Sequence, residues 1–298
     1  MKVKIIYPPK NPEYRESFEI YNVLGEDLVT DEDADFIFYI LDLRIYLTGE
    51  KPHLFPLRES LKKDASKIVI IDYSDPPEIE FIPSDIIEKV GWYFKRSVVK
   101  RGDDMMVYPH LPLSVEITPI YFAVRNDYLR YERSLPPVEE KCYDIACMFL
   151  EGQGGMRSKA VEVVKNRSEK VFHGVVYDKD FSKRYGIVNK EYYNIMRKSK
   201  IIVTANPKDW EGDFRLWEAL LTGSMVMCDR MISNPGLTNR THIIWYDNPE
   251  HLDVLLTYYL QKPEEIEEIG MNGKLWCLSN GLYKHRVQDI LSKIGVSK

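Results

Sequence analysis

Residues 212–223 read GDFRLWEALLTG and lie between two short apolar runs. Gly212 or Asp213 can cap the start of a helix here, because both residue types suit the position before the first turn. Gly223 supplies the left-handed residue that commonly ends a helix. The flanking runs, IIVTA before and SMVMCD after, have the β-branched and apolar content of buried strands. A strand, a helix and a second strand in this order predict a parallel sheet covered by helices.

The same alternation continues over most of the 298 residues, a length that suits two domains of about 150 residues each. It predicts an α/β protein with two Rossmann-like, doubly wound domains that face a cleft. A polar segment with two prolines, YERSLPPVEEK, marks the change between them. We expect a first domain at 1–135, a second at 136–280, and a helical segment at 281–298 that packs back on the first. The expected strands are 3–7, 36–40, 68–72, 91–94, 143–149, 170–176, 200–204, 224–228 and 242–246, and the expected helices are 58–65, 156–166, 189–198, 213–222, 249–261 and 263–279.

The composition argues against several classes of protein. The net charge of -5 provides no basic field of the kind that drives general binding to nucleic acid. The 4 cysteines form no CxxC motif, which argues against structural zinc and fits a reducing compartment. No run approaches the roughly 18 apolar residues of a membrane span. These features predict a cytoplasmic protein with no transmembrane segment and no nucleic-acid partner.

Arg215 and Glu218 lie three residues apart on one face of the predicted helix. A guanidinium near a helix start makes charge-assisted contacts to phosphate oxygens. A carboxylate one turn later is a strong acceptor for vicinal hydroxyls such as those of a ribose, and a nucleoside diphosphate presents both groups. The alternative is an ordinary surface ion pair, which stabilises a helix by roughly a few tenths of a kcal/mol.

The stretch DFRLWEALLTGSMVMCD, followed by HIIWYDNPEHLDVLLTYYLQKPEEIEEIGMNGK, resembles the donor-binding half of GT-B glycosyltransferases. The resemblance is to the exostosin-like group and to related spore-coat and viral sugar transferases, and it extends over about 140–280. It rests on an R-L-x-E-A-L-x-x-G helix, a strand that ends near an aspartate, and a later helical segment with two glycines. It implies a GT-B fold in which Arg215 contacts the diphosphate and Glu218 the ribose of a nucleotide sugar. We assign Asp213 to the same donor site.

A glycine-rich loop, LEGQGGMRSKAV, follows the strand predicted at 143–149. Gly154 and Gly155 allow the backbone to approach a ligand, and Arg157 opens the next helix. The spacing lacks the third glycine of a dinucleotide fingerprint, which disfavours NAD. In GT-B enzymes this loop faces the pyrophosphate, so the resemblance implies that Arg157 is a second phosphate ligand. The alternative is a hinge loop with a solvated arginine.

A third loop, FHGVVYDKDF, places Tyr177 just beyond a predicted strand. By similarity this region lies near the nucleobase, on which we expect Tyr177 to stack. His173 lies within or at the end of that strand, where a core position is the simpler interpretation.

The first half is expected to supply the acceptor site and the catalytic base. The stretch IIDYSDPPE offers Asp72 and Asp75 at a strand end, and YILDLR offers Asp42. An inverting transfer needs a group that deprotonates the acceptor hydroxyl. We assign Asp75 to this role, and Asp72 and Asp42 are the next candidates. Each aspartate has the alternative role of capping a helix or a turn. Lys95, Arg96 and Asp42 are assigned to acceptor or phosphate contacts, and the alternative for the two basic residues is a solvated turn.

The expected mechanism follows from the spacing of two glutamates and from the way in which GT-B enzymes stabilise the leaving group. Retaining enzymes of this fold often carry two glutamates with seven residues between them, whereas Glu211 and Glu218 have six between them. Inversion is therefore expected. GT-B enzymes neutralise the leaving diphosphate with arginine, lysine and helix dipoles in place of a metal. The acidic run DEDAD could mimic a metal site, but we interpret it as a solvated turn, so we expect no metal and no cofactor.

The sequence thus predicts a hexosyl- or pentosyltransferase that moves a sugar from a nucleotide sugar, expected to be UDP-linked, to a glycan or glycoprotein hydroxyl. Two alternatives stay open. A nucleotide-sugar epimerase would bind the same donor without an acceptor. A non-catalytic glycan- or nucleotide-binding module would bind its ligand without turnover.

Overall fold

The computed structural model describes the chain apart from residues 7–14, 30–33, 42–53, 75–76, 78, 80–81, 83, 102–105, 108–115, 150–153, 177–187 and 297–298. The chain divides into two compact units. Unit 1 comprises Met1–Lys100, Val107–Tyr121 and Tyr283–Lys298, and unit 2 comprises Arg101–Met106 and Phe122–Leu282. The terminal helix is thus grouped with unit 1, while residues 122–135, which the predicted ranges gave to the first domain, are grouped with unit 2.

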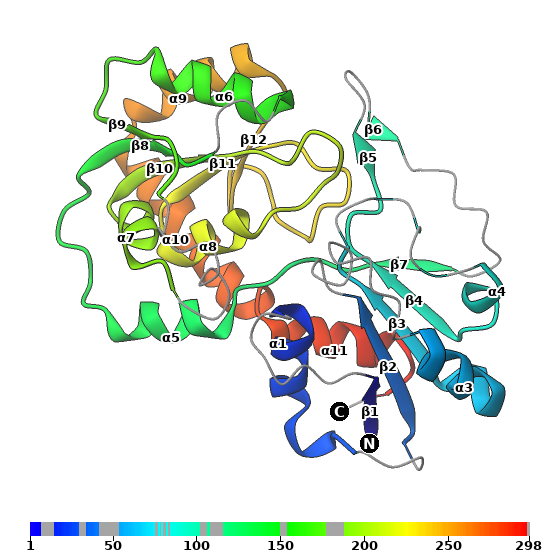
Figure 1. Cartoon of the computed structure of the whole chain (residues 1–298). Helices are drawn as coiled ribbons and strands as arrows, with labels where there is room; N and C mark the ends of the chain where they lie inside the picture. The colour runs from blue at the N-terminus through cyan, green and yellow to red at the C-terminus, as the bar shows by residue number, and fades with distance from the viewer. Residues whose placement is uncertain are drawn as a thin grey trace. The chain divides into compact units, whose positions relative to one another are not determined.

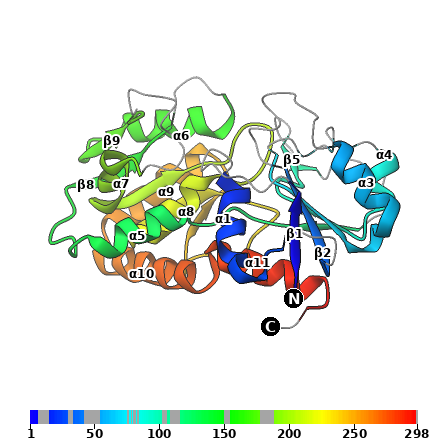
Figure 2. The ribbon, with the colours of Figure 1, turned by 60° about the horizontal axis from the view of Figure 1, so that its bottom comes forward.

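Unit 1 contains a parallel five-stranded sheet in the order β1-β2-β3-β4-β7 (Figure 1). Neighbouring strands follow the chain order, so the winding does not reverse among the described strands. α3 and α4 lie together beside this sheet (Figure 2), and their buried side chains form one apolar cluster with its strands. α1 packs against α11. The elements are β1 (Val3–Ile6), α1 (Arg15–Leu24), β2 (Phe36–Leu41), α3 (Leu54–Asp64), β3 (Ile68–Asp72), α4 (Ser84–Ile87), β4 (Trp92–Lys95), β7 (Ile117–Pro119) and α11 (Tyr283–Lys293), and a two-stranded sheet is formed by β5 (Lys100–Arg101) and β6 (Met106–Val107).

Unit 2 contains a second parallel five-stranded sheet, in the order β12-β11-β10-β8-β9. The chain begins this sheet at β8, adds β9 on one side, and then adds β10, β11 and β12 on the other. The winding therefore reverses between β8 and β10, and open α/β sheets bind ligands at the carboxyl ends of the strands beside such a reversal. α6 and α9 lie on one side of the sheet, and α7 and α8 on the other (Figure 1). The elements are α5 (Asn126–Ser134), β8 (Tyr143–Cys147), α6 (Gly155–Lys165), β9 (Val171–His173), α7 (Lys190–Arg197), β10 (Ser199–Thr204), α8 (Phe214–Thr222), β11 (Met225–Asp229), β12 (Ile244–Tyr246), α9 (Pro249–Leu260) and α10 (Pro263–Asn280).

The sequence explains the start, the end and the position of α8. The side chain of Asp213 accepts a hydrogen bond from the backbone N–H of Arg215, and Gly223 ends the helix in the left-handed region with φ 76°. Leu216 and Leu220 are 2% and 0% exposed, and each such side chain stabilises the fold by about 1.5–3 kcal/mol. Because α8 follows β10, its first turn lies at the carboxyl edge of the sheet.

The two glycines of the GMNGK stretch serve packing. A Cβ at Gly270 would lie 2.5 Å from the carbonyl oxygen of Gly223, and a Cβ at Gly273 would lie 2.5 Å from that of His242. Only glycine allows α10 to approach these backbone groups so closely. These two glycines, which are part of the pattern that resembles the family, therefore allow α10 to pack closely against the backbone and do not indicate a ligand contact.

The expected strands and helices of the second half are present with small shifts at their ends, whereas the first half contains elements that the pattern missed. α1, α4, α5, β5, β6 and β7 had no counterpart among the predictions. The segment from Tyr131, interpreted as a linker, begins inside α5, whose buried Tyr128 and Leu129 face the core. The two prolines of that segment come after the end of α5, so they do not interrupt the helix.

The longest described helix, α10, has 18 residues and includes four glutamates and a lysine. Among the helices that the structure describes, none is both long enough and apolar enough to cross a membrane.

Candidate functional site

The reversal point of the second sheet brings two loops together. One follows β8 and leads into α6, and the other follows β10 and leads into α8. Arg157 of α6 and Arg215 of α8 both lie over the ring of Phe149, with their guanidinium carbons 5.4 and 5.5 Å from the ring centre. Two arginines that the sequence analysis took from separate loops therefore meet at one place.

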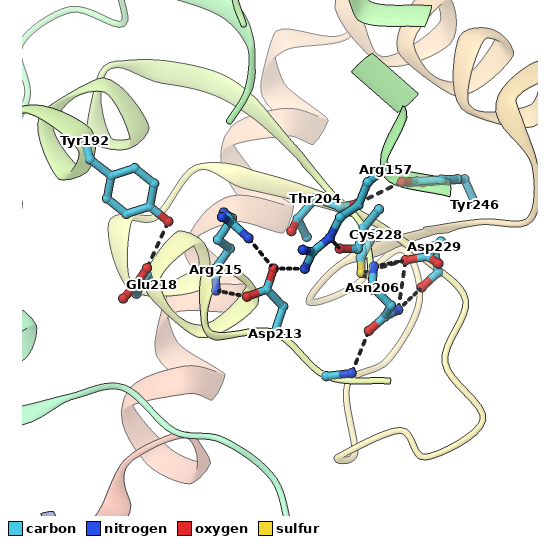
Figure 3. Close-up of polar contacts among 12 residues, drawn as sticks. Arg157, Tyr192, Thr204, Asn206, Asp213, Arg215, Glu218, Cys228, Asp229 and Tyr246 are labelled. Carbon is cyan, nitrogen blue, oxygen red and sulfur yellow. Dashed lines mark hydrogen bonds and ion pairs between the residues drawn. The ribbon is translucent and has the colours of Figure 1, made fainter. Parts of the chain in front are cut away.

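Asp213 joins these two arginines (Figure 3). Its Oδ2 accepts a hydrogen bond from Nη2 of Arg157 at 2.5 Å and another from Nη1 of Arg215 at 2.7 Å. Its Oδ1 accepts from the backbone N–H of Arg215 at 3.3 Å and so caps α8. Nε of Arg157 donates to the carbonyl oxygen of Ala205 at 3.0 Å. A single carboxylate thus holds two cations and the start of a helix.

The three charged side chains are not fully buried, since 9% of Arg157, 13% of Asp213 and 27% of Arg215 stay exposed. Burial opposes the ionised form of Asp213, but attraction to Arg215 and Arg157 outweighs it and lowers the carboxyl pKa. Burial also opposes the charge of Arg215, yet attraction to Asp213 raises its pKa. For Arg157, burial prevails over the attraction of Asp213 and, with the nearby Arg215, lowers the pKa. Both guanidinium groups stay charged at neutral pH, so this cluster carries one net positive charge.

Glu218 lies one turn further along α8 and is 7% exposed. One of its oxygens accepts a hydrogen bond from the phenol of Tyr192, in α7, at 2.9 Å (Figure 3). Burial raises the pKa of Tyr192 well above its usual value, and the charge of Glu218 raises it further. The phenol therefore stays protonated and fixes the direction of the carboxylate.

The start of α6 differs from that of α8. Its N-cap residue, Gly154, provides no side-chain cap, and its first turn contains no acidic residue. Gly154 and Gly155 have φ of 68° and 61°, which favour glycine, and the N–H of Gly154 donates to the hydroxyl of Ser158 at 2.9 Å. A Cβ at Gly155 would lie 3.1 Å from the side chain of Lys208. The start of α6 thus lies beside a lysine and close to the arginine cluster, a setting that favours an anion.

Two buried side chains shape the loop between β10 and α8. Asn206 donates from its backbone N–H and from its amide to Oδ1 of Asp229, at 2.7 and 2.8 Å. Glu211, which is 1% exposed, accepts from the backbone N–H and the hydroxyl of Ser233 at 2.9 and 2.6 Å. Glu211 therefore anchors the loop after β11. These contacts tie together the loops that follow β10 and β11.

Asp72, Lys95 and Arg96 lie at the carboxyl edge of the first sheet and are 1%, 0% and 1% exposed. Asp72 accepts from the backbone N–H and the hydroxyl of Ser74 at 2.8 and 2.5 Å and from the phenol of Tyr93 at 2.7 Å, and it pairs with Lys95 at 3.4 Å. Lys95 and Arg96 each donate to the carbonyl oxygen of Ser74 at 3.1 Å. The structure therefore presents Asp72 as a buried link between strand ends and not as an accessible base. The interpretation of Lys95 and Arg96 as a solvated turn is wrong, since neither reaches solvent.

Three assigned residues, Asp42, Asp75 and Tyr177, lie outside the described residues. His173 ends β9 and is exposed, so the core position expected for it is wrong. Asp35, at the end of the acidic run, accepts from a backbone N–H near the chain start at 2.7 Å. Within the residues that the structure describes, no group of three or more His, Cys, Asp or Glu side chains is arranged to hold a metal ion.

Asn206, Lys208 and Tyr192 are among the residues of the site that were not predicted from the sequence. Asn206 and Lys208 lie in the loop TANPKDWEGD after a predicted strand, and this position in a strand-end loop is the sequence signal that marks them. Tyr192 lies inside a helix and belongs to no motif. Its link to Glu218 depends on the packing of α7 against α8, which no local pattern reveals.

Residues 157–292 match a family model. Its description is glycosyl transferase-like, and the matched segment includes Arg157, Asp213, Arg215 and Glu218. The match and the two-sheet fold together support a glycosyltransferase. No curated protein sequence gives a significant match to this chain.

Several solved structures are similar to this protein over almost the whole chain. One is an alpha-glucosyltransferase in complex with UDP-glucose and DNA containing an abasic site, with a TM-score of 0.58, 9% identity and 99% of both chains covered. Another is the DNA modifying enzyme beta-glucosyltransferase, with a TM-score of 0.55, 13% identity, and 99% of this chain and 100% of that chain covered. A third, Anabaena Alr3699/HepE in complex with UDP and glucose, has a TM-score of 0.53, 9% identity and 99% of both chains covered. At such low identity these likenesses show the fold, and the fold is GT-B.

Proposed function

We propose that the protein transfers a sugar from a UDP-linked donor to a hydroxyl of a glycan acceptor, with inversion and without a metal. The observation that carries the donor half is the cluster of Arg157, Asp213 and Arg215 at the reversal point of the second sheet, within the segment similar to glycosyl transferases. The names of the similar structures support a uridine nucleotide, because they include UDP, UDP-glucose and uridine diphosphoglucose.

Each donor group has a matching feature in this site. The diphosphate lies at the start of α6, where Gly154 leaves the helix without a side-chain cap, and it contacts Arg157 and Arg215. Glu218, held by Tyr192, accepts from the ribose hydroxyls. As the bond to the sugar breaks, negative charge grows on the diphosphate, and two fixed guanidinium groups stabilise it.

The acceptor half of the proposal rests on fewer observations. Asp75 is the proposed general base, because Asp72 is buried and engaged by Ser74, Tyr93 and Lys95. The net charge of -5 favours a neutral glycan over a nucleic acid as acceptor. DNA enters the test as the competing acceptor, since two of the similar structures are named for it.

The proposed function is tested first by calorimetric titration of the full chain with UDP, GDP, ADP and uridine, with and without EDTA. We expect UDP to bind and GDP and ADP to bind far more weakly, and we expect EDTA to change nothing. The UDP sugars that bind are then incubated with glycan, glycoprotein and DNA acceptors, and the anomeric configuration of any product is read by NMR.

Different results would contradict different parts of the proposal. Absence of UDP binding would remove the donor assignment. Conversion of the UDP sugar to its epimer would favour an epimerase, and binding without any turnover would favour a binding module. Loss of activity in EDTA would contradict metal independence, and a product that keeps the donor's configuration would contradict inversion.

A further inference from the structure

The anion position at the start of α8 is occupied by a carboxylate of the protein itself. Asp213 accepts a hydrogen bond from the backbone N–H of Arg215. A bound phosphate would make this same contact at a helix start. The same side chain lies between the two guanidinium groups that would bind a diphosphate. Nη2 of Arg157, Nη1 of Arg215 and the backbone N–H of Arg215 are hydrogen-bond donors that suit the phosphates of a nucleotide sugar. All of them already donate to the carboxylate of Asp213.

We propose that Asp213 is an internal counter-anion, which competes with the diphosphate for Arg157 and Arg215 and so weakens the hold on the nucleotide product. This inference rests on the proposed function, since it presumes that these arginines meet the diphosphate. A nucleoside diphosphate carries more negative charge than the nucleotide sugar from which it forms, so two arginines without a counter-anion would retain the product most strongly. A carboxylate between them offsets part of that attraction.

The competing interpretation is that Asp213 only positions the arginines, in which case its loss would weaken binding. Other contacts argue against that outcome. Nε of Arg157 is held by the carbonyl oxygen of Ala205, and both guanidinium groups lie over the ring of Phe149. These contacts remain when the charge of residue 213 is removed, so the cations stay near their present positions.

The variant Asp213→Asn separates the two interpretations. Asparagine is as good an N-cap residue as aspartate, so α8 keeps its cap while the negative charge is lost. We expect inorganic pyrophosphate and UDP to bind on the order of tenfold more tightly to this variant than to the wild type, because a like charge beside the ligand is gone. Uridine, which has no phosphate, is expected to bind equally to both. UDP dissociation, followed by stopped flow, is expected to slow by a similar factor.

The matched control is Asp144→Asn, which changes the net charge by the same amount. Asp144 lies in β8 and pairs with Lys200 at 2.7 Å, outside the arginine cluster. We expect its affinities for pyrophosphate and UDP to equal those of the wild type. A gain in this control as large as in Asp213→Asn would overturn the proposal, because the effect would then come from net charge alone.

Equal or weaker pyrophosphate binding by Asp213→Asn would also overturn it. If that variant does not fold, Asp213→Ser, which keeps a capping oxygen, takes its place, and failure of both to fold would show a structural role instead. If the wild type binds UDP but the variants show no gain, only this inference fails. If the variants gain affinity for pyrophosphate while no protein binds UDP, the proposed uridine donor fails and the anion competition stands.

Discussion

Each of the two sheets has an aspartate in contact with basic side chains at its carboxyl edge, but the two arrangements differ in what can reach them. At the first edge, Asp72 pairs with Lys95, and both are almost completely buried. At the second edge, Asp213 pairs with Arg157 and Arg215, and more than a quarter of the Arg215 side chain is exposed. The same pairing of charges therefore occurs in a sealed site and in an accessible one.

The difference shows how a structural ion pair can be told from a ligand site. Neutral donors, from Ser74 and Tyr93, complete the shell of Asp72, so this carboxylate fixes strand ends. Asp213, by contrast, pairs with two arginines, which are also the best groups for a phosphate. A cation that is paired and still exposed can exchange its partner for a ligand, whereas a sealed one cannot.

Replacement of a buried charge at the first edge tests this contrast most strongly. Lys95→Met keeps most of the side-chain volume but leaves Asp72 without its cation, which is expected to lower the free energy of unfolding by about 3–5 kcal/mol in urea titrations. Lys89→Met, at an exposed position, is the control and is expected to change little. The folded Lys95→Met protein should bind UDP as the wild type does. Normal stability combined with lost UDP affinity would instead make Lys95 a ligand contact.

The second edge should respond in the opposite way. Arg215→Ala is expected to weaken UDP binding by about 1.5–3 kcal/mol in calorimetry, because a charge-assisted phosphate contact is lost. Arg230→Ala is the matched control, since Arg230 follows β11, pairs with Asp247 and is 55% exposed. Uridine affinity should not change in either variant. Unchanged UDP affinity in folded Arg215→Ala would end the assignment of this arginine to the donor.

The pH dependence of stability gives a third contrast. Because the pKa of Asp213 is lowered in the folded chain, its ion pairs stabilise the fold above the unfolded pKa of about 3.9 and are lost as the pH falls through the folded-state pKa. The stability difference between the wild type and Asp213→Asn should therefore be constant from neutral pH down to about 4 and shrink below that value, by about 1.4 kcal/mol for each unit of the pKa shift. Urea titrations at several pH values measure it, and a difference that is independent of pH in this range would contradict the charge pairing.

The smallest expected effect concerns the ribose. Tyr192→Phe removes the hydrogen bond to Glu218, worth about 1 kcal/mol, while the ring stays in place. We expect UDP to bind a few-fold more weakly, and 2′-deoxy-UDP to bind as it does to the wild type, so that the preference for the ribonucleotide narrows. Tyr143→Phe, on β8 against Phe172, is the control. An unchanged preference would separate Glu218 from ribose recognition.

Much of the second sheet could be predicted from the sequence because its signals are local. The apolar runs, the cap at Asp213 and the exit at Gly223 each act within a few residues. The first half was harder to predict. α1 follows a segment rich in proline and charge, β7 has only 3 residues, and α5 stands directly before a proline-containing linker, which obscures where the helix ends. The residues of the site also depended on local signals. Arg215 and Glu218 could be predicted because they lie on one helix, whereas Tyr192 could not, because it reaches Glu218 from a different helix.

The sequence by itself determined the α/β alternation, the helix that carries Arg215 and Glu218, and the glycines that open α6, because each depends on neighbours along the chain. Only the tertiary structure decided that Arg157 and Arg215 share one oxygen of Asp213, and that Asp72 and Lys95 are sealed. The order of strands, with its reversal between β8 and β10, brings together Arg157 and Asp213, which are 56 residues apart in the chain. The physical reason is that burial and charge pairing are properties of neighbours in space, which strand order sets and local sequence does not.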